Sequence, residues 1–132
     1  MTTRDLKESS PSPLADRFRT YLPVVIDIET GGFNSVTDAV LEISAVILSM
    51  NKDEKLVINQ TFFSRVIPFE GSNIEDSALK FTGIDPYHPL RVARPEKIVF
   101  QNLFKLVRDA MKSNGCKRAI FCLLYTSPSP RD

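Results

Sequence analysis

Two carboxylates, Asp27 and Glu29, stand two residues apart at the end of an apolar segment that begins at Pro23. In a β-strand the side chains alternate between faces, so residues i and i+2 project from the same side. Two like charges side by side on an otherwise buried strand are unfavourable unless a cation binds them. Oxygen ligands suit hard ions such as Mg²⁺ or Mn²⁺, which serve in phosphate chemistry. The pair therefore predicts a metal-dependent phosphodiesterase of the nuclease type.

The residues around the pair support a site more than a plain strand. Alternating acids usually mark a strand face that is exposed to solvent. Here the segment is apolar on both faces apart from these two residues, which argues against that interpretation. Gly31 and Gly32 follow, and they let another group approach the backbone closely at the carboxyl end of the strand, where ligands of open α/β sheets bind. Phe33 comes next in a loop, where a large ring stays exposed unless something covers it.

The composition limits the class of protein. The chain has 132 residues, of which 42% are hydrophobic, and this fits one domain at most. Its formal net charge is +1, so an anion-binding surface must come from local clustering. Cys116 and Cys122 form neither a disulfide framework nor a zinc pattern, and we expect reduced packing residues. The sequence shows no signal peptide and no apolar run of membrane-spanning length, so we expect a cytoplasmic protein without a membrane partner.

The expected elements form an α/β fold. Residues 1–13 are predicted to be a disordered leader, followed by a short helix within 14–21. Strands are expected over 24–29, 38–50 and 55–68, and the short turn at 51–54 makes neighbouring strands antiparallel. Helices are expected over 73–81 and from Pro95, within the first turn, to a cap at Gly115. A strand over 117–124 then returns parallel to an earlier one. The prediction is a three-stranded antiparallel meander plus a parallel strand, in one mixed sheet with helices packed on it.

The acidic segment resembles the first motif of the DEDDh 3′→5′ exonucleases, a family with a ribonuclease H-like fold. The motif consists of VVIDIETGGF over residues 24–33 and continues as DAVLEI over residues 38–43. Within that family the chain resembles the ribonuclease T group over about residues 14–121. The supporting stretches are DRFR at 16–19, ALKFTGIDP at 78–86, FKLVR at 104–108 and SNGCKRAI at 113–120. The FTGIDP part favours this group over polymerase proofreading subunits and oligoribonucleases, which share only the acidic motif.

The resemblance implies roles for particular residues. Asp27 and Glu29 would be two of the four acidic ligands of a two-metal Mg²⁺ site, with Mn²⁺ as the other candidate ion. Phe33 and Phe81 match aromatic positions that in the family stack on the bases at the 3′ end. From residue type alone, Phe81 serves equally well as a core residue of its short helix. Glu42 either supports the metal ligands or is simply an acid on a strand.

Four basic residues match a patch that in the family binds RNA away from the metals: Arg17, Arg19, Lys112 and Arg118. That family forms a homodimer in which the patch of one subunit presents the substrate to the active site of the other. Without the resemblance, these residues would be ordinary solvated surface. The implied partners are the 3′ ends of tRNA and small stable RNA, single-stranded DNA as a further candidate, and a second copy of the chain.

The sequence also departs from the family. Its only histidine, His88, lies in a loop and does not match the catalytic histidine of the family. The third acid belongs in a His-Asn-x-x-Phe-Asp context after the strand near Phe121, and a fourth acid and the base histidine follow much later. None of them is present, and residues 122–132 resemble a non-native tail. We expect residues 14–121 to be the N-terminal part of an exonuclease domain, truncated on its C-terminal side and inactive by itself.

Two functions from different classes remain. In the first, the intact gene encodes a metal-dependent 3′→5′ exoribonuclease that trims the 3′ ends of tRNA and other small stable RNAs. In the second, the chain is a non-catalytic RNA-binding or dimerising module that uses the basic patch and the aromatic residues. The intact Asp27 and Glu29 favour the first, because a module that only binds has no need of them. An unrelated α/β domain with a chance acidic pair is hard to reconcile with several separate matching stretches.

Overall fold

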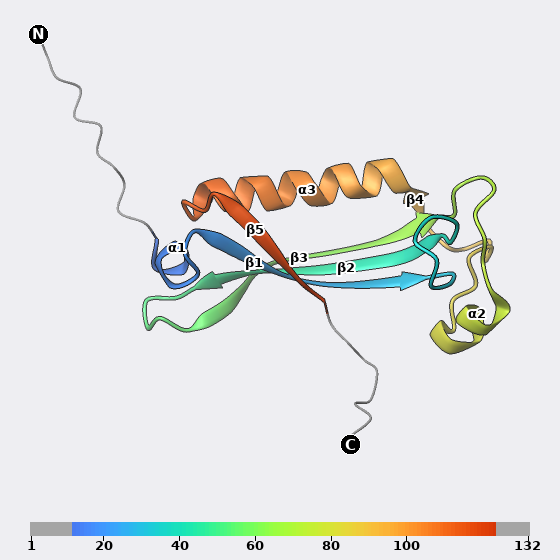
Figure 1. Ribbon diagram of the computed structural model, residues 1–132, viewed down its shortest axis with the longest axis horizontal. Helices are drawn as coiled ribbons and strands as arrows, with labels where there is room; N and C mark the ends of the chain where they lie inside the picture. The colour runs from blue at the N-terminus through green and yellow to red at the C-terminus, as the bar shows by residue number, and fades with distance from the viewer. Residues whose placement is uncertain (1–11, 124–132) are drawn as a thin grey trace, which may run out of the picture.

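A five-stranded mixed sheet organises residues 12–123, the part of the chain that this computed structural model describes (Figure 1). In chain order the elements are α1 (Pro13–Arg17), β1 (Tyr21–Thr30), β2 (Val40–Met50), β3 (Leu56–Ile67), α2 (Asp76–Thr82), β4 (Arg94–Pro95), α3 (Glu96–Ser113) and β5 (Arg118–Leu123). The strand order across the sheet is β4-β3-β2-β1-β5. β1, β2 and β3 are antiparallel neighbours, whereas β5 runs parallel to β1 and β4 parallel to β3. The predicted meander with an added parallel strand is confirmed.

Several element bounds differ from the prediction for local reasons. β1 begins at Tyr21, three residues early, because β5 continues the ladder down to that residue. Asp38 was expected in the second strand but lies before it, where it forms an isolated bridge with Asn73. α2 begins at Asp76 and not at Asn73 for the same reason. Pro95 is the N-cap of α3 and pairs with the end of β3 as part of β4, a two-residue strand that was not predicted.

The core lies between α3 and one face of the sheet. Val99, Leu103, Val107 and Ala110 recur at helical spacing and are all buried. They pack in one cluster with alternate residues of β1 and β2, among them Val24, Ile26, Ile43, Ala45 and Ile47. Burial of one such aliphatic side chain contributes about 1.5–3 kcal/mol. The helix therefore packs on the middle of the sheet. The strand residues that alternate with these core positions project from the opposite face.

The helix ends connect the start of the described chain to its last helix. The Oγ of Ser12 accepts from the backbone N–H of Ala15 at 3.2 Å, which caps α1, and it donates to the carbonyl of Asn114 at 2.6 Å. Asn114 ends α3, and Gly115 follows with a left-handed φ of 63°. Most of the predicted leader and tail, residues 1–11 and 124–132, lies outside the described residues.

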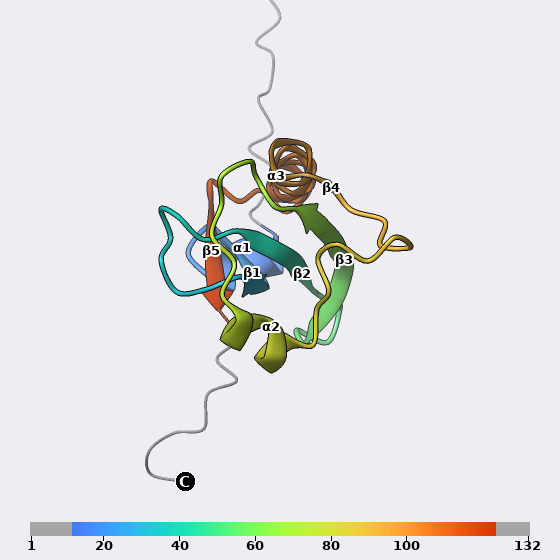
Figure 2. The same cartoon turned by 90° about the vertical axis from the view of Figure 1, so that its right-hand side faces the viewer.

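Among the described residues, α2 is the helix on the side of the sheet opposite α3. Figure 2 shows the two helices on opposite sides of the sheet, and Figure 1 shows α2 beyond the ends of the strands. Cys122 of β5 is exposed, so the expectation that both cysteines are packing residues holds for the buried Cys116 alone. Across residues 12–123, no helix is both long and apolar enough to cross a bilayer.

Candidate active site

Asp27 and Glu29 project from the face of the sheet opposite α3. Val24 and Ile26 of the same strand belong to the core under α3, so the alternation of the strand turns the two acids the other way. Both carboxylates are partly buried. The ladder places Asp27 opposite Ser44 and Glu29 opposite Glu42 on β2. Three carboxylates therefore share a small area of this face.

Burial and the crowding of these acids raise the pKa of Glu29. Burial is the first cause that raises the pKa of the Glu29 carboxyl, and the charges of Asp27 and then Glu42 raise that pKa further. Glu42 has a cation beside it, because the Nε of Arg65 lies 3.6 Å from its Oε1. The Arg65 guanidinium also lies over the ring of Phe63, at 5.4 Å from its centroid. Glu42 is therefore more than a solvated acid on a strand: it faces Glu29 and anchors a basic side chain.

The donor set fits a hard cation held in part by groups other than protein. Within the described range 12–123, no three metal-binding side chains converge on one point. Mg²⁺ is commonly bound by one or two carboxylates, with water and substrate phosphate oxygens completing its shell. Asp27 and Glu29 supply that pair, and a cation beside them would relieve the repulsion that raises the Glu29 pKa.

An aromatic cavity of about 330 Å³ opens beside Glu29. Phe33 and Phe81 line it together with Gly32, Ala78 and other residues from the end of β1 and from α2. The ring of Phe33 is fully exposed, and Phe81 is 84% exposed. The interpretation of Phe81 as a core residue is therefore wrong, and α2 has no buried residue at all. Two large exposed rings next to a carboxylate make a surface on which flat, apolar groups can stack.

The turn after β1 packs against the segment that leads into α2. The N–H of Gly31 donates to Ala39 at 2.8 Å, and its carbonyl accepts from the N–H of Glu75 at 2.7 Å. A Cβ on Gly31 would lie 3.1 Å from the Cα of Ile74, so the close approach depends on glycine. α2 then ends at Gly83, which adopts a left-handed φ of 70°. These contacts set the two walls of the cavity side by side.

Asp38 is a buried carboxylate that the sequence analysis did not single out as a site residue. It is 7% exposed and accepts hydrogen bonds from the N–H of Asn34 at 2.8 Å, the hydroxyl of Thr37 at 2.9 Å and the Nδ2 of Asn73 at 3.0 Å. These bonds, that from Asn73 first, lower the pKa of the Asp38 carboxyl. In the sequence, Asp38 opens the DAVLEI stretch and follows Asn34 by four residues in a polar turn, a common turn pattern.

The four basic residues gather at the other end of the domain. Arg17 ends α1, Arg19 precedes β1 and Lys112 lies in the last turn of α3. The Nη1 of Arg118 lies 3.3 Å from the hydroxyl of Tyr21, at the start of β1. Figure 1 shows α1 and the end of α3 at the opposite end of the sheet from α2. The structure therefore separates the basic residues from the acidic pair and the cavity.

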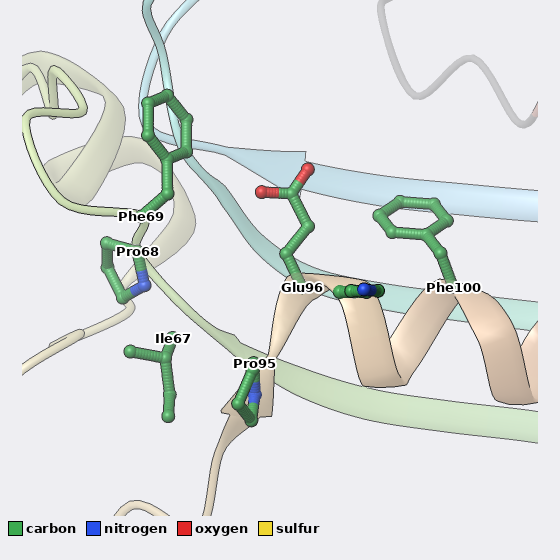
Figure 3. Close-up of a pocket in the computed structure, with 7 residues that line it drawn as sticks. Ile67, Pro68, Phe69, Pro95, Glu96 and Phe100 are labelled. Atoms are coloured by element: carbon green, nitrogen blue, oxygen red, sulfur yellow. The ribbon is translucent and has the colours of Figure 1, made fainter.

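Two other features lie outside the aromatic cavity. His88 is exposed in the loop after α2, as expected, and its Nδ1 accepts from the N–H of Leu90 at 3.1 Å. A larger cavity of about 550 Å³ lies where β3 ends and α3 begins. Figure 3 shows Glu96 and Phe100 projecting from the first turns of α3 toward the same side, with Pro68 and Phe69 following β3. None of the predicted site residues lines this larger cavity.

Comparison with known proteins decides the family. The RNase T family model, described as exonuclease, matches residues 24–125. The chain belongs to the RNase T exonuclease family. The match begins within β1 just before Asp27 and includes both phenylalanines of the cavity. The interpretation as an unrelated domain with a chance acidic pair is therefore wrong.

Individual relatives agree with this RNase T assignment. Ribonuclease T of Hahella chejuensis strain KCTC 2396 is 58% identical over 109 residues. The match covers 83% of this chain and 50% of the relative, so the chain spans half the length of the curated relative it matches. Solved structures of E. coli Exonuclease I with a dT13 and with a dA16 oligonucleotide superpose with a TM-score of 0.53 at 16% identity. Each covers 65% of this chain and 18% of the exonuclease, which shows a shared fold.

Proposed function

We propose that this chain carries the 3′-end binding site and half of the acidic ligands of a Mg²⁺-dependent 3′→5′ exoribonuclease. The single observation that carries the proposal is the aromatic cavity, in which Glu29, Phe33 and Phe81 meet. The substrates are the 3′ ends of tRNA and other small stable RNAs, as the relationship to Ribonuclease T suggests. The protein acts in the cytoplasm, and residues 14–121 are the N-terminal part of its catalytic domain.

Each group has a role that its position supports. Phe33 and Phe81 stack on the terminal bases, and stacking accepts any base because every base has a flat face. Asp27 and Glu29 would hold the metal, and Glu29 also lines the cavity in which the bases stack. When bound, Mg²⁺, with two ions in the complete site, would stabilise negative charge on the substrate phosphate and activate a water. Mn²⁺ prefers the same oxygen ligands. Glu42 lies opposite Glu29 on β2 and pairs with Arg65.

The basic residues fit a second role in the same function. Arg17, Arg19, Lys112 and Arg118 lie too far along the sheet to serve the acidic pair of their own chain. We propose that they bind the body of the RNA and present its 3′ end to the cavity of a second copy. Single-stranded DNA is a further substrate candidate, because stacking and phosphate contacts do not require a 2′-hydroxyl.

The chain by itself is proposed to bind RNA without cleaving it. Among the described residues, Glu29 is the carboxylate that lines the cavity, and Asp27 projects from the same face of β1 two residues before it. Two carboxylates leave the metal site short of protein ligands and of a general base. The alternative, an RNA-binding or dimerising module that never cleaves, rests on the same basic residues. What distinguishes the two functions is whether the site becomes active when the other half of the domain is present.

A chimera tests this directly. Residues 14–121 of this chain would replace the matching segment of the Hahella Ribonuclease T, to which the chain is 58% identical. We expect the chimera to shorten a 5′-labelled single-stranded RNA one nucleotide at a time in Mg²⁺. The same chimera with Glu29→Gln, and the chain alone, should leave the RNA intact. A folded chimera without activity would contradict the exonuclease proposal and leave the binding module.

A further inference from the structure

Asp38 contacts both neighbours of Phe33 in the chain. On one side the N–H of Asn34 donates to its Oδ2 at 2.8 Å. On the other side, a Cβ built on Gly32 would lie only 2.1 Å from the same Oδ2, so the carboxylate packs directly against the Gly32 backbone. The hydroxyl of Thr30 donates to the carbonyl of Gly32 at 2.7 Å and restrains the turn further. The backbone that carries the Phe33 ring is therefore fixed from both sides, although the ring itself is fully exposed.

The same carboxylate reaches the other wall of the cavity through Asn73. The Nδ2 of Asn73 donates to the Oδ1 of Asp38 at 3.0 Å. Backbone bonds run parallel to this contact: the N–H of Asn73 donates to Thr37 at 2.7 Å, and the N–H of Ala39 donates to Asn73 at 3.2 Å. Asn73 lies three residues before α2, the helix that carries Phe81. Because no residue of α2 is fully buried, the contacts of the segment that precedes it contribute to its position.

We propose that Asp38 is a positioning residue for RNA binding, which holds Phe33 in a fixed place relative to Phe81 so that both rings are ready for the 3′-terminal bases. The inference rests on the proposed function, because it concerns the same cavity. Asp38 does not line that cavity and so acts through Phe33 and the segment before α2. Rings that are fixed before binding lose little conformational entropy when a base binds, and this smaller entropy loss makes the binding free energy more favourable.

The test uses a short single-stranded RNA with 2-aminopurine as its 3′-terminal base, whose fluorescence reports stacking. Asp38→Ala should weaken binding by ~5-fold or more, the low end of one lost base stack, and reduce the fluorescence change at saturation. Asp38→Asn should restore most of both, because its amide oxygen still accepts from the N–H of Asn34. Its amide nitrogen can donate to the hydroxyl oxygen of Thr37, or to the Oδ1 of Asn73 once the Asn73 amide turns over. Asp53→Ala, in the exposed turn between β2 and β3, is the matched control and should behave as wild type.

Circular dichroism and thermal unfolding show whether each variant folds. If Asp38→Ala does not fold, Asn73→Ala decides. It removes the side-chain bond between Asp38 and the segment before α2, keeps the backbone bonds of Asn73, and leaves the bonds within the Phe33 loop. Weaker stacking by a folded variant supports the proposal, and wild-type affinity with a full fluorescence change overturns it. Absence of any fluorescence change with the wild-type chain would instead contradict the proposed function, so the two failures are distinguishable.

Discussion

Replacement of Phe81 by alanine should separate binding from folding. Phe81 is 84% exposed on a helix without buried residues, so its ring contributes little to the folded state. We expect the free energy of unfolding to change by less than about 0.5 kcal/mol, as for other surface substitutions. If the ring stacks on a base, its loss removes ~1–3 kcal/mol of binding free energy, which is ~5–150-fold in Kd. Phe33→Ala should behave in the same way for the same reasons.

The assay is fluorescence anisotropy of a 5′-labelled, single-stranded RNA titrated with the chain, in parallel with urea unfolding of each variant. Tyr87→Ala is the matched control, because Tyr87 is also an exposed aromatic (76%) and does not line the cavity. Its affinity for RNA should equal that of wild type. Unchanged RNA affinity in both phenylalanine variants would refute the stacking argument. A loss of several kcal/mol of stability in Phe81→Ala would show that the ring is packed and not exposed.

Four further predictions concern the core, the acids, the metal and the basic end. Leu103→Ala empties a fully buried position under the sheet and should cost about 2–5 kcal/mol in urea unfolding; a loss below about 1 kcal/mol would contradict the packing of α3. The pKa of Glu29 is raised in the folded state, so its favourable contribution to the free energy of unfolding is present at acid pH. That contribution is lost as the pH rises through the folded-state pKa. Glu29→Gln should therefore have a higher melting temperature than wild type at pH 7, and the same melting temperature below pH 4.5, the ordinary pKa of a glutamate. A melting temperature below that of wild type at pH 7 would contradict this. Mg²⁺ should raise the melting temperature of wild type but not of Asp27→Asn; equal shifts would place the ion elsewhere. Arg17→Ala and Arg118→Ala should each flatten the dependence of log K on log salt for RNA by ~0.7; unchanged slopes would remove these residues from the RNA contact.

The acidic pair and the meander were predictable because both depend on local rules. A strand alternates its side chains with period two, so the common face of Asp27 and Glu29 follows from their spacing. The turn at 51–54 joins adjacent strands over a short distance and makes them antiparallel. The apolar positions of α3, such as Leu103, recur at helical spacing and reveal the buried side of the helix. Each of these signals lies within a few residues of the element that it determines.

The rest depends on contacts between distant segments. The sequence near Phe81 does not show whether its side of α2 packs or faces solvent, because α2 has no fully buried residue and the segment before it is bonded to a distant loop. Asp38 accepts a hydrogen bond from Asn73, which lies 35 residues away in the sequence. β4 exists only because Arg94 and Pro95 meet the end of β3. The roles of the basic residues follow from the family resemblance, since spacing alone gives no reason to group Arg17 with Arg118.

The most direct test of the 3′-end site places 2-aminopurine at either end of the same single-stranded RNA. The wild-type chain should change the fluorescence of the 3′-terminal probe, and the change should disappear in Phe33→Ala and Phe81→Ala. A 5′-terminal probe should respond little. An equal response at the two ends, or a 3′ response that survives both substitutions, would contradict the assignment of this cavity to the 3′ end of RNA.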